Sequence, residues 1–272
     1  MKIICLVKII PDVDHFTYDY EKNILVRENQ KSLLNPDDAC AVAAALNFKK
    51  RYGANVTIVS MGPVSNRKYL EDLVRRGADR AVLLADTLYR GSDTYATSRI
   101  LAKGVEKYEF DLIFCGARSM DGDTSHVPSQ VAELLDVNIM SGVVKIREEE
   151  EPVRMIQIET EDDERHMTFA LRFPAVLGIT KESGYKLPFA RYEDRKKDVS
   201  EQIHVLSNLH LGFQEAETGL AGSKTKVVRT YPKAFAQEKK RIVRTDESGI
   251  EYVYQFLKEK GFVRDDSNTC FS

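Results

Sequence analysis

The sequence predicts an α/β protein built on an open, mainly parallel β-sheet with flanking helices. Short apolar runs that suit buried strands alternate with segments whose apolar residues recur at helical spacing. Up to about residue 139 these strand–helix units follow one another every ~25 to 30 residues, as parallel strands with right-handed crossovers require. The stretch from Phe110 to Leu135 shows the pattern most clearly, because it reads as strand, loop and helix.

Four such units follow in order along the first part of the chain. A small hairpin is expected at residues 19–27, between the first strand and the first helix. That helix starts at Asn35-Pro36, a cap followed by proline, and Gly53 is a fitting stop. Gly77 closes the second helix, and Ser92 or Asp93 caps the third. The predicted strands cover residues 2–10, 56–61, 81–84 and 110–116.

After residue 139 the pattern becomes antiparallel. Residues 143–147, 153–160 and 167–173 form runs separated by acidic turns, which predicts antiparallel strands at one end of the sheet. Residues 175–180 form the last strand that the pattern predicts. We therefore expect one α/β domain at residues 1–180.

Residues 181–272 are expected to form a long C-terminal arm that ends in a helix. Periodicity is poor from residue 181 to about 246, and structureless stretches of that length are uncommon inside compact domains. This stretch is therefore either disordered or laid over another surface. The helix that follows can end at Gly261, and it either docks on a partner or packs back on the chain's own domain. Its apolar face consists of Ile250, Val253, Tyr254 and Leu257.

Composition argues against several classes of function. The 272 residues carry a formal net charge of −2, so no net field draws the chain to nucleic acid or anionic lipid. Basic runs at residues 195–197 and 238–241 are interpreted as solvated surface. The cysteines form no CxxC pair, which argues against a zinc site, an iron–sulfur cluster held by this chain alone and a disulfide scaffold. Reduced thiols in a cytoplasm fit these cysteines best, and neither a signal peptide nor the ~20 apolar residues of a membrane span is expected.

The loop at residues 117–126 is the first candidate for a functional site. It follows the carboxyl end of a predicted strand, where open α/β folds usually bind ligands. Thr124 or Ser125 can cap the next helix, and Pro128 lies in its first turn. The free N–H groups of that turn favour an anion such as phosphate.

Two interpretations of this loop stay open. Because it contains no Gly-Lys-Ser/Thr sequence, phosphoryl transfer has no support and binding is favoured. In the alternative, Asp121 and Asp123 only form the turn and cap the helix, with no ligand. No Ser/His/Asp or Cys/His arrangement demands nucleophilic catalysis, and the histidines fit no metal signature, so we name no catalytic side chain.

Eight motifs occur along the chain in a characteristic order and spacing. They are Val7-Lys8, Asn35-Pro36, Ser60-Met61-Gly62-Pro63, Arg76-Gly77-Ala78-Asp79-Arg80, Asp93-Thr94, Asp121-Gly122-Asp123-Thr124, Phe173-Pro174-Ala175-Val176 and the segment from Thr218 to Val228. Together they resemble the β subunit of electron-transfer flavoproteins. The similarity covers nearly the whole chain, and the motifs in register are far more specific than any one of them.

The resemblance implies an obligate heterodimer with an α subunit that carries an FAD. It implies that residues 1–180 form a Rossmann-like domain holding an adenine nucleotide, and that residues 181–272 wrap around the α subunit. In simple carriers of the family this nucleotide is AMP. In the electron-bifurcating branch it is the ADP portion of a second FAD, whose flavin takes a hydride from NADH and splits the two electrons. NAD is then a transient substrate, and ferredoxin is a low-potential acceptor on another chain.

The loop sequence bears on the choice between FAD and AMP. Asp121-Gly122-Asp123-Thr124 resembles the bifurcating type more than the AMP type, so the resemblance implies FAD, with AMP as the alternative. His126 departs from a usual glutamine and Pro128 from a usual glycine. These changes leave the backbone role of the loop plausible, and a solvated first-turn side chain is the simpler interpretation of His126.

Matching residue by residue gives the expected nucleotide contacts. Backbone amides at the helix start meet phosphate, hydroxyl and amide side chains meet ribose or phosphate, and strand ends supply apolar walls for adenine. For Thr94 and Thr97 the alternative is helix capping and ordinary surface polarity. Arg118 either offsets pyrophosphate charge or pairs with an aspartate of its own loop. The expected contacts are Leu6, Asn35, Gly62, Thr94, Thr97, Arg118, Asp121, Gly122, Asp123, Thr124, Ser125, His126 and Val127.

The resemblance also bears on the dehydrogenase partner. Family members that serve acyl-CoA dehydrogenases often have Pro-Arg shortly after the last strand, whereas residues 184–192 here lack it. Leu187 or Phe189 is a candidate anchor of an interaction surface. The changed motif implies another flavin dehydrogenase, such as one for a 2-hydroxy acid.

Two functions of other classes are weighed against this one. A stand-alone nucleotide-binding or sensor domain would give no role to the long arm. A nucleotide-dependent ligase or pyrophosphatase would need a Ser-Gly-Gly-type phosphate loop after the first strand. Ile10-Pro11-Asp12 offers no such loop.

Overall fold

The computed structural model describes residues 1–12, 17–19, 24–26, 32–147, 155–161, 165–226, 228 and 241–263. The chain divides into two compact units, Met1–Arg229 and Thr230–Ser272, and each is described by itself. The expected hairpin turn at residues 22–23 and most of the basic run at 238–241 lie outside the described residues.

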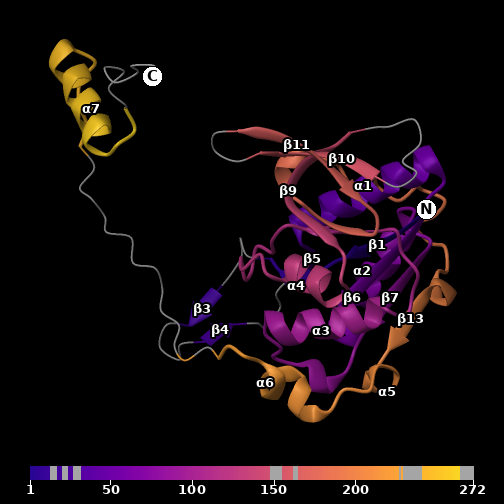
Figure 1. Ribbon diagram of the computed structural model, residues 1–272. Helices are drawn as coiled ribbons and strands as arrows, with labels where there is room; N and C mark the ends of the chain where they lie inside the picture. The colour runs from indigo at the N-terminus through magenta and orange to yellow at the C-terminus, as the bar shows by residue number, and fades with distance from the viewer. Residues whose placement is uncertain are drawn as a thin grey trace. The chain divides into compact units, whose positions relative to one another are not determined.

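A nine-stranded sheet forms the centre of the first unit (Figure 1). Its strand order is β11-β10-β9-β12-β8-β1-β6-β7-β13. The strands from β9 to β13 in this order are parallel, whereas β9, β10 and β11 pair antiparallel at one end. The predicted fold class is thus confirmed. The strands are β1 (Lys2–Leu6), β6 (Asn55–Met61), β7 (Arg80–Leu84), β8 (Leu112–Gly116), β9 (Asn138–Ile146), β10 (Met155–Glu161), β11 (His166–Arg172), β12 (Ala175–Ile179) and β13 (Ile203–Leu206).

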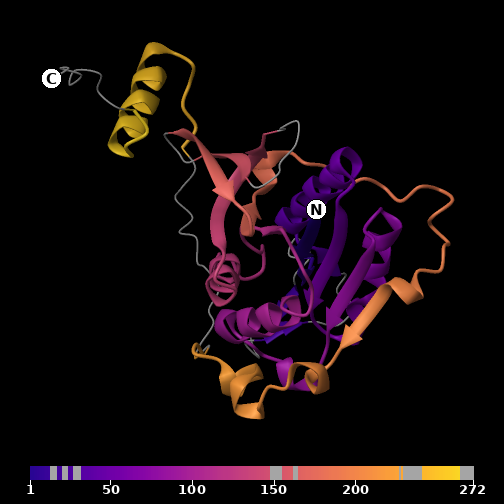
Figure 2. The same cartoon turned by 45° about the vertical axis from the view of Figure 1, so that its right-hand side comes forward.

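Helices cover both faces of this sheet, which explains the continuous apolar runs of its central strands. Every residue of β8 and β12 is buried. On one face α1 (Pro36–Tyr52) and α2 (Arg67–Arg75) pack, with the Phe48 ring edge-on to Phe114 at 5.6 Å. On the other face α3 (Thr94–Val105) and α4 (Val127–Leu134) lie side by side (Figures 1 and 2).

The helix ends follow the sequence signals, with two corrections to the expected caps, the first being that the Asn35 side chain makes no capping bond at the start of α1. Gly53 ends α1 in the left-handed region at φ 66°, and the Asp93 side chain caps α3 by accepting from the Ala96 N–H at 3.0 Å. Neither Thr124 nor Ser125 caps α4, because the residue before its first turn is His126, which makes no side-chain capping bond. The preceding loop turns instead through left-handed conformations, and Ser125 has φ 55°.

The first predicted strand is shorter than expected. The chain leaves the sheet after Leu6, and β2 (Ile9–Pro11) pairs antiparallel with β5 (Ser32–Leu34) in a separate ribbon. The expected hairpin is present as β3 (Thr17–Asp19) paired with β4 (Ile24–Val26).

Residues 181–226 carry an additional strand and several single turns. β13 joins the edge of the sheet beside β7. The compact unit continues to Arg229, so the first part of the expected arm packs with the α/β domain. Its contact with a partner stays a prediction. The short helices of the chain are η2 (Val64–Asn66), η3 (Thr87–Tyr89), η4 (Lys181–Ser183), η5 (Ser200–Gln202), α5 (Asn208–Leu211), η6 (Glu215–Glu217) and α6 (Gly219–Gly222).

The second unit contains α7 (Glu247–Glu259). Asp246 caps it by accepting from the Gly249 N–H at 2.9 Å, and Gly261 follows its end at φ 79° as the sequence predicts. The side chains of Ile250, Val253 and Tyr254 are exposed. Among the described residues, no helix has the length and apolar character needed to cross a bilayer.

Candidate functional site

A cavity of about 340 Å³ opens at the carboxyl ends of β1 and β8. In chain order the sheet grows from β1 to β6 and β7 on one side and then continues with β8 on the other. The cavity therefore lies at the topological switch point, where open α/β sheets bind their ligands. The starts of α1, α3 and α4 complete its walls. It is lined by Leu6, Val7, Lys8, Asn35, Asp38, Met61, Ser92, Asp93, Thr94, Thr97, Leu101, Cys115, Gly116, Ala117, Arg118, Ser119, Gly122, Thr124, Ser125, His126, Val127 and Pro128.

Most of the residues predicted from the sequence lie in this lining. Three do not. Gly62 lies at the end of β6, where its N–H donates to the Leu84 carbonyl at 3.1 Å. Asp121 and Asp123 face basic side chains instead of the cavity. The predicted residues in the lining are Leu6, Asn35, Thr94, Thr97, Arg118, Gly122, Thr124, Ser125, His126 and Val127.

The loop at residues 117–126 is held in place by the buried side chain of Asn35. Its Nδ2 donates to the Arg118 carbonyl at 2.8 Å, and its Oδ1 accepts from the Met120 N–H at 3.1 Å. Asn35 is only 1% exposed. These bonds explain why the first helix starts with asparagine although its side chain caps nothing.

A second brace joins this loop to the end of β1. The Lys8 ammonium lies 2.7 Å from both carboxylate oxygens of Asp121 and 3.4 Å from the Ser119 hydroxyl. Burial acts to raise the pKa of Asp121, but the hydrogen bonds and charge of Lys8 outweigh it and hold the pKa below its usual value. Asp121 therefore positions the loop as an ionised group.

Asp38 forms the floor of the cavity and was not predicted. Its Oδ1 accepts from the Gly116 N–H at 2.7 Å and its Oδ2 from the Lys8 N–H at 2.8 Å. Burial raises the pKa of this carboxyl to about 7, although these hydrogen bonds oppose the shift. In the sequence Asp38 looks like an ordinary acid of a helix first turn, so only the structure reveals its contacts with two strand ends.

The start of α3 forms the opposite rim and ties a distant segment to it. One carboxylate oxygen of Asp93 accepts from the N–H groups of Lys224 and Thr225, both at 2.8 Å, while the Asp93 N–H donates to the Ser223 hydroxyl. Burial would raise the pKa of Asp93, but the hydrogen bonds to Ala96, Thr225 and Lys224 lower it. The segment at residues 223–225 is thus fixed beside the cavity.

The chemistry of the lining suits a phosphorylated ligand with an apolar ring. Leu6, Met61 and Leu101 offer apolar surface, and the first turn of α4 offers N–H groups that have no partner within the helix. Arg118 pairs with Asp123 at 3.6 Å, and both side chains are about half-exposed or more. Such a pair contributes little, so the guanidinium is available to an anion.

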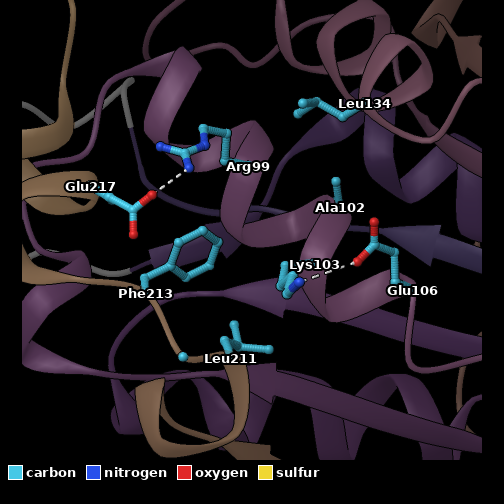
Figure 3. Close-up of a pocket in the computed structure, with 9 residues that line it drawn as sticks. Arg99, Ala102, Lys103, Glu106, Leu134, Leu211, Phe213 and Glu217 are labelled. Atoms are coloured by element: carbon cyan, nitrogen blue, oxygen red, sulfur yellow. Dashed lines mark hydrogen bonds and ion pairs between the residues drawn. The ribbon is translucent and has the colours of Figure 1, made fainter.

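A second pocket of about 300 Å³ lies between α3 and residues 211–217 (Figure 3). Arg99 pairs there with Glu217 at 2.8 Å, and Lys103 lies 3.8 Å from Glu106. Because Arg99 already makes a close ion pair with Glu217, this pocket is the weaker candidate for an anionic ligand.

Comparison with known proteins identifies the family. The family model described as the electron transfer flavoprotein domain matches residues 22–202, which is more than half of the chain. The chain belongs to the electron transfer flavoprotein family. Two of the three relatives below carry the name of the β subunit, so the resemblance found in the sequence is confirmed, and with it a role in electron transfer.

Three electron transfer flavoprotein relatives show how far the similarity extends. The β subunit of Thermoanaerobacterium thermosaccharolyticum is 35% identical over 234 residues, 85% of this chain and 87% of the relative. The β subunit of Clostridium acetobutylicum is 31% identical over 266 residues, 97% of this chain and 100% of the relative. Subunit CarD of the caffeyl-CoA reductase–Etf complex of Acetobacterium woodii is 33% identical over 236 residues, 85% and 87% of the two chains.

Proposed function

We propose that this chain is the β subunit of a cytoplasmic heterodimer and binds an adenine nucleotide in the cavity at the ends of β1 and β8. The cavity itself carries the proposal, because its place at the switch point, its apolar walls and its helix starts suit adenine and phosphate together. Leu6 and Leu101 would contact the base, and the first turn of α4 with Arg118 would contact phosphate.

The size of the cavity bears on the ligand. Its volume of about 340 Å³ is at the lower end of small-molecule sites, which span roughly 300–1,000 Å³. This space suits AMP or the ADP portion of a larger cofactor. A complete FAD would have to extend its isoalloxazine ring beyond the cavity, toward the surface where another subunit could contact it.

We propose FAD as the nucleotide and electron bifurcation as the activity. The support is the loop sequence Asp121-Gly122-Asp123-Thr124, in which Gly122 and Thr124 lie in the cavity lining. Bound FAD would supply hydride acceptance from NADH and one-electron transfer, while this chain positions it. The acceptors in this proposal are a flavin dehydrogenase and a low-potential carrier such as ferredoxin. The alternative is a non-bifurcating carrier with AMP in the same cavity, which the departures at His126 and Pro128 keep open.

We place the docking surface for the dehydrogenase, of acyl-CoA or 2-hydroxy acid type, on residues 184–192. Phe189 is 84% exposed and Tyr192 is 89% exposed, as anchors of an interface require. Arg76, directly after α2, donates to the Pro188 carbonyl at 2.9 Å, and its guanidinium lies 5.9 Å from the centre of the Phe189 ring. These contacts hold the aromatic anchor outward.

The test is co-expression with an α subunit followed by extraction of the bound nucleotides. Two FAD per heterodimer are expected. One FAD with one AMP would overturn bifurcation and leave the simple carrier. A chain that forms no heterodimer would contradict both, and would favour a stand-alone nucleotide-binding domain.

A further inference from the structure

Asp38 is a buried acid that the proposed function does not yet use. It is 6% exposed and lies in the cavity lining, on the first turn of α1. Its two carboxylate oxygens accept from backbone N–H groups of two different strands' ends, Lys8 after β1 and Gly116 at the end of β8. Both of these residues also line the cavity. One side chain therefore sets the spacing of the two chain segments that form the floor of the site.

The fit around Asp38 is close. A Cβ atom at Gly116 would lie 2.5 Å from Asp38 Oδ1, so the strand end can approach the carboxylate only as glycine. The side-chain amide of Asn35, which braces the loop at residues 117–126 through the Arg118 carbonyl, also acts to lower the pKa of Asp38. The carboxylate thus joins the chain after β1 to the end of β8.

We propose that Asp38 is a positioning residue for the nucleotide, and that its ionised carboxylate holds the two strand ends in the arrangement that binds the ligand. This inference rests on the proposed nucleotide site. An ionised carboxylate can accept both N–H groups at once. When it gains a proton, the carboxyl loses its charge and the protonated oxygen becomes a much weaker acceptor, so the N–H group that faces it loses most of its hydrogen bond. The site then loosens.

The pH at which this happens follows from the groups around Asp38. Its pKa is about 7, so the switch falls near neutral pH. The pKa of Asp37 is also raised by burial, and the charge of Asp37 adds to the shift at Asp38. The titratable and charged groups that face Asp38 or share its cavity are Asp37 of α1, Cys5 of β1, Lys8, Cys115 of β8, Arg118 and His126 of the loop, and Asp93 before α3.

The experiment measures FAD affinity of the full-length chain, freed of bound nucleotide, by titration calorimetry from about pH 6 to about pH 8. The pyrophosphate of FAD is a diester and does not titrate in this range, so the protein causes any change. Wild-type affinity is expected to fall about tenfold on acidification, as the loss of one hydrogen bond to a charged group implies. Because imidazoles change charge near neutral pH, the series is repeated with His126→Gln. AMP serves as a second ligand.

Two variants sharpen the measurement. Asp38→Asn presents an amide in place of one acceptor, so it is expected to bind FAD about tenfold more weakly at pH 8 and to lose the pH step. The matched control is Asp37→Asn, because that carboxylate accepts from the Lys181 N–H outside the cavity lining. Asp37→Asn is expected to keep the pH-dependent step in FAD affinity. The midpoint of this step moves to lower pH, because the charge of Asp37, which raises the pKa of Asp38, is removed.

The outcomes separate this inference from the proposed function. Wild-type protein that binds neither FAD nor AMP overturns the proposed function. Wild-type protein whose FAD affinity is the same at pH 6 and pH 8, or rises on acidification, overturns the role of Asp38 and leaves the nucleotide site standing. The wild-type profile decides this even if Asp38→Asn does not fold.

Discussion

Gly116 shows at the scale of single residues how the cavity constrains the chain. A Cβ atom there would lie 2.5 Å from Asp38 Oδ1 and 2.9 Å from the Asp38 backbone nitrogen, inside a packed helix start. The backbone of the helix start cannot move away from the new methyl group as a flexible side chain could. Gly116→Ala is therefore expected to lower the free energy of unfolding by about 1–3 kcal/mol. Urea denaturation measures this change.

The matched control is Gly122→Ala in the loop of the same cavity. A Cβ atom at Gly122 would meet only the Ser119 hydroxyl, at 3.8 Å, which is an ordinary contact. We expect this variant to change the free energy of unfolding by less than about 0.5 kcal/mol. Equal losses in the two variants would contradict the steric account of Gly116.

Asp38 also predicts how stability depends on pH. Its folded-state pKa of about 7 is above the usual aspartate pKa of 3.8, so the folded protein holds this proton more tightly than the unfolded chain. The resulting stability is fully present below about pH 4 and is lost as the pH rises through about 7. Relative to Asp38→Asn, the wild-type free energy of unfolding is expected to fall across this window by up to about 1.4 kcal/mol per pH unit.

Urea denaturation of both proteins at a series of pH values measures this difference. A difference that stays constant between about pH 4 and about pH 7 would show that burial does not shift this carboxyl. The expected result means that ionisation of the Asp38 carboxyl lowers the free energy of unfolding. A side chain whose ionised form lowers stability but raises ligand affinity is typical of a residue retained for its function.

At the scale of elements, the sequence predicts those strands and helices whose buried residues form a continuous run or recur at helical spacing. The unit β8, loop and α4 was predictable because β8 is fully buried and Val131 repeats at helical spacing after Val127. β13 was missed because only Ile203 of its four residues is buried and Val205 is exposed, so it carries no apolar run.

The same contrast holds for the site. The loop at residues 117–126 was predicted because a strand end and a helix start mark the carboxyl edge of a sheet, whereas Leu6 and Asn35 were predicted from the resemblance to the family. Asp38 was missed because its role depends on two strand ends that are distant in sequence and adjacent only after folding. The role of Asn35 as a brace of the loop was hidden for the same reason.

Asp93 connects the start of α3 to the segment at residues 223–225. Replacing it by alanine removes the cap of α3 and the acceptor for the N–H groups of Lys224 and Thr225. Asp93→Ala is expected to lower the free energy of unfolding by about 1–2 kcal/mol. Hydrogen exchange of the two released amides should accelerate. Unchanged exchange at Lys224 and Thr225 would show that something other than Asp93 fixes this segment.

At the scale of the whole molecule, the two compact units differ in what stabilises them. The unit Met1–Arg229 contains the sheet, its helices and the clusters of buried apolar side chains on the two faces of the sheet. The unit Thr230–Ser272 contains α7, a helix of 13 residues with exposed apolar side chains. Isolated helices of this length are marginal in water, so α7 needs a packing surface to persist.

A truncated chain that ends at Arg229 tests whether the first unit is stable by itself and whether α7 contributes to binding the α subunit. Because the first unit has its own core, the truncated chain is expected to unfold cooperatively, with a free energy of unfolding within about 1 kcal/mol of the full chain's. Its affinity for the proposed α subunit should fall at least about tenfold, since α7 no longer offers its apolar face. Ile250→Glu in the full chain should weaken the same association without loss of the fold. Truncated protein that binds the α subunit as tightly as the full chain would show that residues 181–229 alone carry the interface.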